Sequence, residues 1–320
     1  MKKKKILFGY AFNKEGFAHL EDRFELIYPT ESKFTNEEII KLLPGVEVLV
    51  PNFSAASYVG KEVIDAGVDL KLICNYGVGY DNIDVQYAAQ EEIVVTNTPT
   101  SVLEPTAELA FAHILTTARM IGYFNTKLHK GERVDWSLFG DLGLPVYGTT
   151  LGIFGMGRIG QAVARRAIAS GMKIIYHNRT RLASEIEDEY SATYVDFETL
   201  LKESDFLSLN APSTATTKHI ISTAEFQKMK KTAILINTAR GALVDEQALI
   251  KALNAKEIAG AGLDVYENEP KISPELLQMD NVVLTPHIGT KTMAYRLDMQ
   301  REVAKNIINF FDGGQLDKVN

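Results

Sequence analysis

The chain has 320 residues, enough for two domains of ordinary size, and its 46% hydrophobic and 23% charged residues are typical of a soluble globular protein. The net charge of −7 argues against general nucleic-acid binding. The single cysteine, Cys74, cannot form an internal disulfide, which favours a reducing compartment. The apolar part of the start MKKKKILFGY is too short for a secretory leader, and no apolar run is long enough to span a membrane, so we expect a cytoplasmic protein.

Residues 1–96 alternate short apolar runs with helical patterns. Strands are predicted at 6–8, 24–27, 46–50, 72–74 and 93–95, and helices at 36–43 and 61–66. Strands that alternate with helices indicate a parallel sheet covered on both faces. Pro99 interrupts this pattern because proline cannot continue a central strand. A long helix over 106–129 and an irregular connection over 131–148 are predicted to follow.

The segment LGIFGMGRIG, residues 151–160, is a short apolar strand followed by Gly155, Gly157 and Gly160 in the spacing G-x-G-x-x-G. A helix over 158–170 and a strand over 173–177 are predicted next. This order is typical of the phosphate end of a dinucleotide-binding unit. There, Gly155 permits the tight turn, Gly157 lets the backbone approach a pyrophosphate, and Gly160 lets the helix pack on the strand. The helix N-terminus would face the phosphates.

The second half of the chain continues the alternation of strands and helices. Further strands are predicted at 206–209, 233–236, 260–265 and 282–284, and a last helix at 292–311. Ser222 and Glu225 have the spacing of a capping box, and Asp245 is placed as the N-cap of a helix that runs to about Leu253.

The second strand of the nucleotide-binding unit ends in Asn178, Arg179, Thr180 and Arg181, without the carboxylate that would hold the ribose hydroxyls of NAD. Arginines with a hydroxyl or an amide suit a 2′-phosphate instead, so this strand end favours NADP. The alternative is that both arginines are solvated surface residues and that NAD binds.

Three candidate catalytic residues follow predicted strands, where open α/β sheets bind their ligands. Arg240 can bind a carboxylate with two hydrogen bonds. His287 and Glu269 are the residue types that form a proton-transfer pair near neutral pH. Taken singly, Arg240 could be a surface ion-pair residue and His287 a structural histidine; together they favour catalysis. The chain lacks the spacings of a metal site and of a serine nucleophile, so we expect no metal.

The chain resembles the D-isomer-specific 2-hydroxyacid dehydrogenases over nearly its whole length, most closely over 72–299. The motifs that carry the resemblance are NYGVGYDNID at 75–84, LGIFGMGRIG at 151–160, NTARG at 237–241, GLDV at 262–265 with Glu269-Pro270, and PHIG at 286–289.

The resemblance implies reduction of a 2-oxoacid by hydride transfer from NAD(P)H. The N–H groups of Val78 and Gly79 would bind the substrate carboxylate together with Arg240, which also polarises the carbonyl. His287 would protonate the carbonyl oxygen, and Glu269 would keep its imidazole charged. The cofactor would be lined, in addition to the glycines and strand end above, by Thr106, Arg158, Ile159, Ala211, Pro212, Thr217, Thr238, Asp264, His287 and Gly289.

The sequence does not decide which 2-oxoacid is the substrate. The arginine-rich strand end and the pair Trp136-Ser137 resemble glyoxylate/hydroxypyruvate reductases, in which a tryptophan of the partner subunit reaches the pocket. Trp136 could equally be an interface anchor alone. Phe53 could offer an apolar wall to a bulkier 2-oxoacid such as phenylpyruvate or 2-oxoisocaproate. Lys291 and Ala294 differ from the residues usual at these positions in the family, and nothing in the sequence explains the two differences.

We therefore expect two doubly wound parallel-sheet domains. A Rossmann nucleotide-binding domain (100–287) is inserted into a flavodoxin-like substrate domain (1–99 and 288–320), and the cleft between them holds the active site. The resemblance implies a homodimer formed through 106–148, with a small 2-oxoacid as ligand and neither nucleic acid nor membrane as partner. A nucleotide-sensing, non-catalytic binding protein is the alternative from another class, although no polar tail or partner motif supports it.

Overall fold

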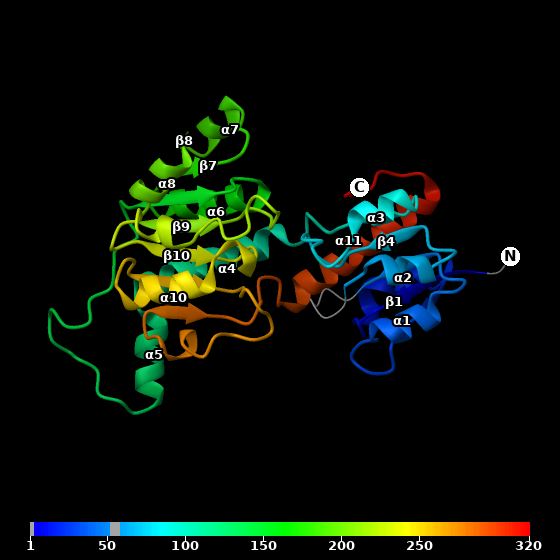
Figure 1. Cartoon of the computed structure of the whole chain (residues 1–320), viewed down its shortest axis with the longest axis horizontal. Helices are drawn as coiled ribbons and strands as arrows, with labels where there is room; N and C mark the ends of the chain where they lie inside the picture. Colours follow the sequence, from blue (N-terminus) through cyan, green and yellow to red (C-terminus); the bar gives the residue numbers. More distant parts are fainter. Residues whose placement is uncertain (1–2, 52–57) are drawn as a thin grey trace. The chain divides into compact units, whose positions relative to one another are not determined.

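The computed structural model describes residues 3–51 and 58–320. It divides the chain into two compact units, coloured from blue to red along the sequence in Figure 1. Unit 1 comprises Met1–Val102 and Thr290–Asn320, and unit 2 comprises Leu103–Gly289. Both are α/β units with wholly parallel sheets, which confirms the predicted fold class. Among the described residues, no helix is both long and apolar enough to cross a membrane.

Unit 1 contains a five-stranded sheet in the flavodoxin-like order β2-β1-β3-β4-β5. The strands are β1 (Lys4–Phe8), β2 (Phe24–Ile27), β3 (Val48–Val50), β4 (Leu72–Cys74) and β5 (Val94–Thr96). One face is covered by η1 (Lys14–Leu20) and α11 (Met293–Asp312), and the other by α1 (Asn36–Leu42), α2 (Lys61–Ala66) and α3 (Val85–Gln90). Because both faces are covered, β3 and β4 are buried along their whole length.

Unit 2 contains a seven-stranded sheet in the order β12-β11-β10-β9-β6-β7-β8. The strands are β6 (Thr150–Phe154), β7 (Lys173–His177), β8 (Ala192–Tyr194), β9 (Phe206–Leu209), β10 (Ile234–Asn237), β11 (Gly260–Leu263) and β12 (Val282–Leu284). The strand order reverses between β6 and β9, and ligands of doubly wound sheets bind beside such a switch point.

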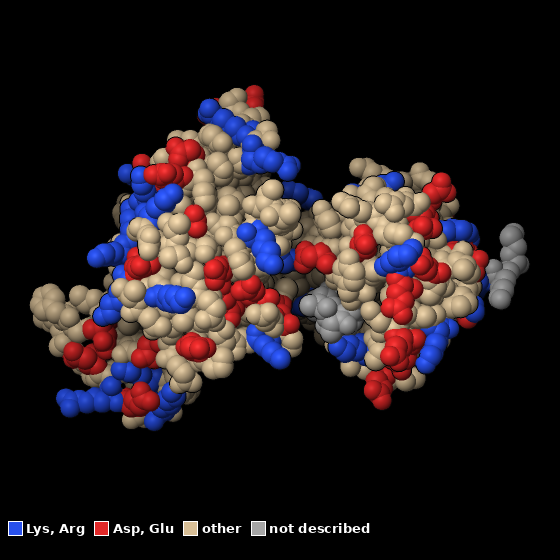
Figure 2. Space-filling view, in the orientation of Figure 1, with Lys and Arg blue, Asp and Glu red and all other residues tan. Residues whose placement is uncertain are grey.

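Helices cover both faces of the unit 2 sheet. One face packs against α4 (Leu103–Ala118) and α6 (Arg158–Ala169), and the other against α8 (Phe197–Glu203), α9 (Thr223–Phe226) and α10 (Glu246–Asn254). The remaining helices of the unit are α5 (Ile121–His129), α7 (Ser184–Glu189), η2 (Gly241–Leu243) and η3 (Leu276–Gln278). On the face drawn in Figure 2, acidic and basic side chains are interspersed over this unit.

The predicted strands at 24–27, 72–74, 206–209 and 282–284 have the observed bounds, and Asp245 caps α10 by accepting the N–H of Ala248 at 3.0 Å. The prediction of one helix over 106–129 was wrong. The helix ends at Ala118, and Met120 adopts a left-handed φ of 53° before α5 begins. The returning chain caps this end, because the N–H of Leu144 bonds the carbonyl of Ala118 at 2.7 Å.

Candidate active site

The imidazole of His287 and the carboxylate of Glu269 form a hydrogen-bonded pair. Nδ1 of His287 lies 2.8 Å from Oε2 of Glu269, and the other carboxylate oxygen accepts the N–H of Tyr266 at 3.0 Å. Glu269 follows β11 and His287 follows β12, and these strands are neighbours in the sheet. Two separate loops of one unit therefore bring the pair together. Both residues follow strands, as expected from the sequence.

The carboxylate of Glu269 is kept charged by its neighbours. Burial by itself would raise its pKa, but the hydrogen bond and charge of His287, the N–H of Tyr266 and the charge of Arg240 together lower that pKa below the ordinary range. The influence of Arg240 also shows that its guanidinium lies in the electrostatic neighbourhood of the pair. All three candidate catalytic residues thus belong to one charge network within unit 2.

The loop that carries Arg240 is shaped by Asn237, the last residue of β10. Its side-chain amide donates to the carbonyl of Arg240 at 2.9 Å and accepts the N–H of Ala239 at 3.1 Å. Arg240 itself donates from one guanidinium nitrogen to the carbonyl of Ala239 at 2.7 Å. These bonds turn the chain sharply after the strand and orient the arginine at the sheet edge.

Asp264 organises the backbone on both sides of His287. Its carboxylate accepts the N–H groups of Ile288 at 2.8 Å and Gly289 at 2.9 Å, and its carbonyl accepts the N–H of His287 at 2.9 Å. His287 adopts a left-handed φ of 51°, which is uncommon for a residue other than glycine. Burial raises the pKa of Asp264, although these donors and the hydroxyl of Thr285 oppose the shift.

The glycine-rich turn after β6 fits the phosphates of a dinucleotide. Gly155 has a φ of 91°, and a Cβ there would lie 2.6 Å from the backbone nitrogen of Ala211. A Cβ on Gly160 would lie 2.6 Å from the carbonyl oxygen of Gly155, so only glycine allows this packing. A Cβ on Gly157 would meet nothing within 4 Å, which leaves space beside the first turn of α6 at Arg158.

Other cofactor candidates lie around this turn and the neighbouring strand ends. The hydroxyl of Thr238 is buried without a partner among the described residues, so it could bond a dinucleotide. The hydroxyl of Thr217 donates to the carbonyl of Pro212 at 2.8 Å, so these two residues fix one loop. A Cβ on Gly289 would lie 3.5 Å from Thr106. The half-buried Ile159 belongs to the first turn of α6.

The four residues after β7 have different roles in the structure. Asn178 accepts the N–H of Met156 at 2.6 Å and so supports the glycine-rich turn. Arg181 forms two hydrogen bonds to Glu187, at 2.9 and 2.7 Å. Arg179 and Thr180 are exposed, and no described residue forms an ion pair with Arg179. Arg179 is therefore the more available of the two arginines for a phosphate ligand.

In unit 1 the segment around Val78 and Gly79 is held by two asparagines. Asn75 donates to the carbonyls of Gly77 at 3.2 Å and Gly79 at 2.6 Å, and Asn97 donates to that of Val78 at 2.8 Å. These bonds fix the orientation of the peptide groups of the turn, whose N–H groups at Val78 and Gly79 are the candidate donors to a ligand. Phe53, the candidate wall for bulky substrates, lies outside the described residues.

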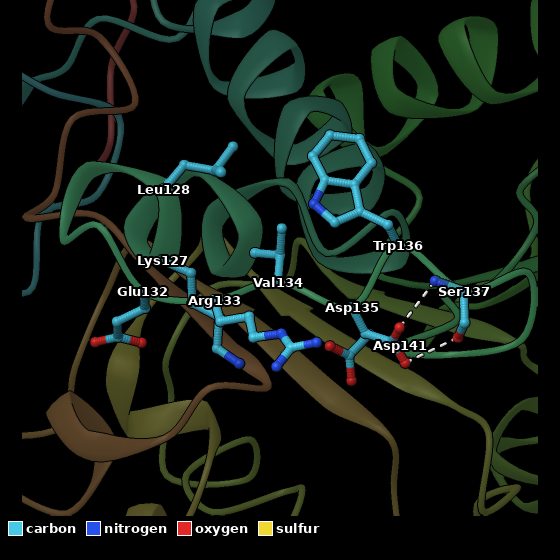
Figure 3. A pocket seen from close by; sticks show the side chains of 9 residues that line it. All are labelled: Lys127, Leu128, Glu132, Arg133, Val134, Asp135, Trp136, Ser137 and Asp141. Carbon is cyan, nitrogen blue, oxygen red and sulfur yellow. Dashed lines mark hydrogen bonds between the residues drawn. The ribbon is translucent and has the colours of Figure 1, made fainter.

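A separate hollow of about 980 Å³ lies between α5 and the segment that follows it (Figure 3). We call residues 131–149 the arm. Trp136 belongs to the arm and lines this hollow, 88% exposed, and Figure 3 shows Ser137 bonded to Asp135 beside it. The candidate catalytic residues do not line this hollow. In the described part of the chain, no group of three or more His, Cys, Asp and Glu residues could hold a metal ion.

Sequence reasoning missed the residues that position the candidate site, namely Asn75, Asn97, Asn237 and Thr285. A signal was present for three of them, because each asparagine ends or follows a buried apolar strand, where a ligand or a loop needs side-chain hydrogen bonds. No local pattern distinguishes Thr285, since its contacts come from distant parts of the chain.

Residues 111–289 match the model of the D-isomer specific 2-hydroxyacid dehydrogenase NAD binding domain. The chain is 45% identical over 316 residues to a glyoxylate reductase from Pyrococcus horikoshii, covering 97% of this chain and 94% of that protein. The crystal structure of a glyoxylate reductase from Paecilomyes thermophila is similar, with a TM-score of 0.91, 38% identity and coverage of 100% and 99%.

An NADPH-dependent glyoxylate/hydroxypyruvate reductase from Sinorhizobium meliloti, solved with NADP and malonate, has a TM-score of 0.88 to this structure. It is 32% identical, and the match covers 99% of this chain and 97% of that one. The sequence identities, the shares of each chain that are covered and the charge network at the strand ends all point to one enzyme family. The chain belongs to the D-isomer specific 2-hydroxyacid dehydrogenase family and is an NAD(P)-dependent oxidoreductase that acts on a small oxoacid.

Proposed function

We propose that this enzyme is a glyoxylate/hydroxypyruvate reductase that prefers NADPH. The observation that carries the proposal is the pair of His287 and Glu269 with Arg240 in its electrostatic neighbourhood. A proton donor, a fixed carboxylate and an arginine are what reduction of a 2-oxoacid requires from the protein. The relatives and solved structures that act on glyoxylate or hydroxypyruvate supply the substrate class.

The reaction adds a hydride to the carbonyl carbon and a proton to the carbonyl oxygen, and bound nicotinamide supplies the hydride. Arg240 binds the substrate carboxylate and stabilises negative charge on the carbonyl oxygen. His287 gives its proton to that oxygen from Nε2, because Nδ1 is bonded to Glu269. The charged Glu269 fixes the orientation of the ring through its contact with Nδ1.

The backbone of Val78 and Gly79 is assigned to carboxylate binding. The bonds from Asn75 and Asn97 commit the carbonyls of this turn to the protein and fix the orientation of its peptide groups. Two backbone N–H donors suit a carboxylate and carry no preference for the group on the carbonyl carbon, which is hydrogen in glyoxylate and hydroxymethyl in hydroxypyruvate. Both proposed substrates are therefore compatible with this binding mode.

The cofactor is held by unit 2 in this proposal. The glycines 155, 157 and 160, with the first turn of α6 at Arg158 and Ile159, bind the pyrophosphate, and Thr238 bonds the dinucleotide through its buried hydroxyl. Arg179 binds the 2′-phosphate of NADP, with Thr180 and Arg181 beside it. The reductase from Sinorhizobium meliloti, solved with NADP, supports this preference.

The proposal is tested by initial rates with glyoxylate, hydroxypyruvate, pyruvate, phenylpyruvate and 2-oxoisocaproate, each with NADPH and with NADH. We expect the highest kcat/KM for the two small substrates with NADPH. Preference for the bulky acids would overturn the substrate assignment and leave the mechanism in place. Cofactor binding without turnover of any oxoacid would favour a nucleotide-sensing protein.

We also propose a homodimer formed through α5 and the arm. Leu138 and Phe139 on the arm are 86% and 85% exposed, and Leu128 on α5 is 59% exposed. So much apolar surface on one extension is typical of an interface, and the family resemblance points to a second copy of the chain as the occupant. In light scattering after size exclusion, the variant Leu138→Ser/Phe139→Ser should run as a monomer, whereas an exposed position elsewhere, Val68→Ser, should leave the dimer intact.

A further inference from the structure

Another histidine, His113, is buried in unit 2 and has no part in the mechanism above. It is 2% exposed, on the face of α4 that packs against the sheet. A Cβ on Gly262 of β11 would lie 2.9 Å from Cβ and 3.0 Å from Nδ1 of His113, so the glycine provides the space into which the imidazole fits.

The imidazole of His113 begins a chain of hydrogen bonds that ends at the backbone beside His287. Nε2 of His113 lies 2.9 Å from the hydroxyl of Thr285, and that hydroxyl donates to Oδ1 of Asp264 at 2.6 Å. The Asp264 carboxylate in turn accepts the N–H groups of Ile288 and Gly289, which directly follow His287.

The donors of this chain can be assigned from its contacts. The Asp264 carboxylate accepts two backbone N–H groups, and the single hydroxyl proton of Thr285 is its third donor. Thr285 must therefore accept from Nε2–H of His113. Nδ1 of His113, which is buried without a partner among the described residues, then carries a lone pair rather than an orphaned N–H group. Burial also lowers the pKa of His113 to about 4, so the ring is neutral at pH 7.

We propose that His113 is a positioning residue for the proton-transfer step, which acts through Thr285 and Asp264 on the backbone that orients His287. The inference rests on the proposed function for its kinetic consequence. Without the proton from His113, the hydroxyl of Thr285 is free to rotate away from Asp264. The Asp264 carboxylate then loses the hydrogen bond from Thr285 and is less firmly placed to accept the N–H groups of Ile288 and Gly289. The left-handed turn at His287 loosens, and the imidazole loses its fixed orientation.

The test compares His113→Leu, which removes the donor, with His113→Gln, whose amide nitrogen can reach Thr285. We expect kcat for glyoxylate to fall about 10-fold in His113→Leu, less than the ~10²-fold that a 1 Å misplacement can cost. The KM for glyoxylate should stay within about two-fold of wild type, because His113 makes no contact with the substrate in the proposed site. His113→Gln should recover most of kcat.

Two further measurements separate this role from simple loss of packing. In a double-mutant cycle, His113→Leu should have no further effect on kcat in a Thr285→Val background, because the path through the hydroxyl is already broken. Amide hydrogen exchange at Ile288 and Gly289 should speed up in His113→Leu and not in His113→Gln.

The exchange measurement does not depend on turnover. If wild type reduces no 2-oxoacid, the proposed function fails, and faster exchange at Ile288 and Gly289 would still support the coupling to His113. Unchanged exchange and unchanged kcat in a folded His113→Leu variant would overturn the inference, as would additive effects of the His113 and Thr285 substitutions on kcat.

Discussion

Nδ1 of His287 and Oε2 of Glu269 lie 2.8 Å apart, although 18 residues separate the two in the chain. The contact exists because β11 and β12 are parallel neighbours, so the loops that follow them meet at one edge of the sheet. The pair is only half buried, with 42% of the His287 side chain and 29% of the Glu269 side chain exposed. The imidazole is therefore the more exposed member of the pair, and the carboxylate is the more buried one.

The first prediction concerns the charge of Glu269. The pKa of Glu269 is lowered by its partners despite burial, so the carboxylate stays ionised throughout the neutral range. Glu269→Gln keeps the side-chain shape but not the charge. We expect kcat for glyoxylate at pH 7 to fall between about 10-fold and 10²-fold, because an amide holds Nδ1 of His287 less strongly than a charged carboxylate does. Steady-state rates with NADPH measure the loss, and a kcat within about two-fold of wild type would show that the charge has no role.

The second prediction distinguishes the two arginines after β7. Arg179→Ala should raise the KM for NADPH on the order of 10-fold or more with little effect on NADH, because a charged hydrogen bond to the phosphate is lost. Arg181→Ala should have the smaller effect, since Arg181 is bonded to Glu187. Steady-state kinetics with both cofactors measures the difference. Equal effects of Arg179→Ala on NADPH and NADH would contradict a 2′-phosphate site.

The third prediction concerns the turn at Val78. Asn97→Ala removes the donor to the carbonyl of Val78 and should let the peptide rotate. We expect the KM for glyoxylate to rise about 10-fold, the effect of one hydrogen bond to a charged group, with the Kd for NADPH unchanged. The matched control is Asn36→Ala, which removes a side-chain bond to the carbonyl of Tyr58 elsewhere in unit 1. Equal kinetic effects of the two substitutions would indicate a general loss of stability.

The fourth prediction is a pH dependence of stability that originates at His113. Its folded pKa of about 4 lies below the ordinary histidine value of 6.5, so between these values the unfolded state binds the proton and the folded state does not. The histidine therefore costs stability as pH falls from about 6.5 to 4. The Tm of wild type should drop more steeply over this range than that of His113→Gln. Parallel curves would contradict a neutral buried imidazole.

The fold was predictable from sequence where short apolar runs became buried strands, as at Leu72–Cys74 and Phe206–Leu209. The break at Met120 was not, because it depends on a chain that returns to cap Ala118 from more than 20 residues away. Likewise, the proximity of Glu269 and His287 could be expected from their places after predicted strands. The difference between Arg179 and Arg181 could not, because it depends on Glu187 in α7, a helix that the pattern did not predict.

The central claim, that His287 is the proton donor in reduction of a 2-oxoacid, is tested most directly by His287→Ala. The measurement is kcat for glyoxylate with NADPH, alongside the Kd for NADPH from a fluorescence titration. We predict a loss of kcat between about 10²-fold and 10⁴-fold, with the Kd within about two-fold of wild type, because proton transfer is lost and cofactor binding is kept. A variant that retains more than about a tenth of the wild-type kcat would contradict the assignment.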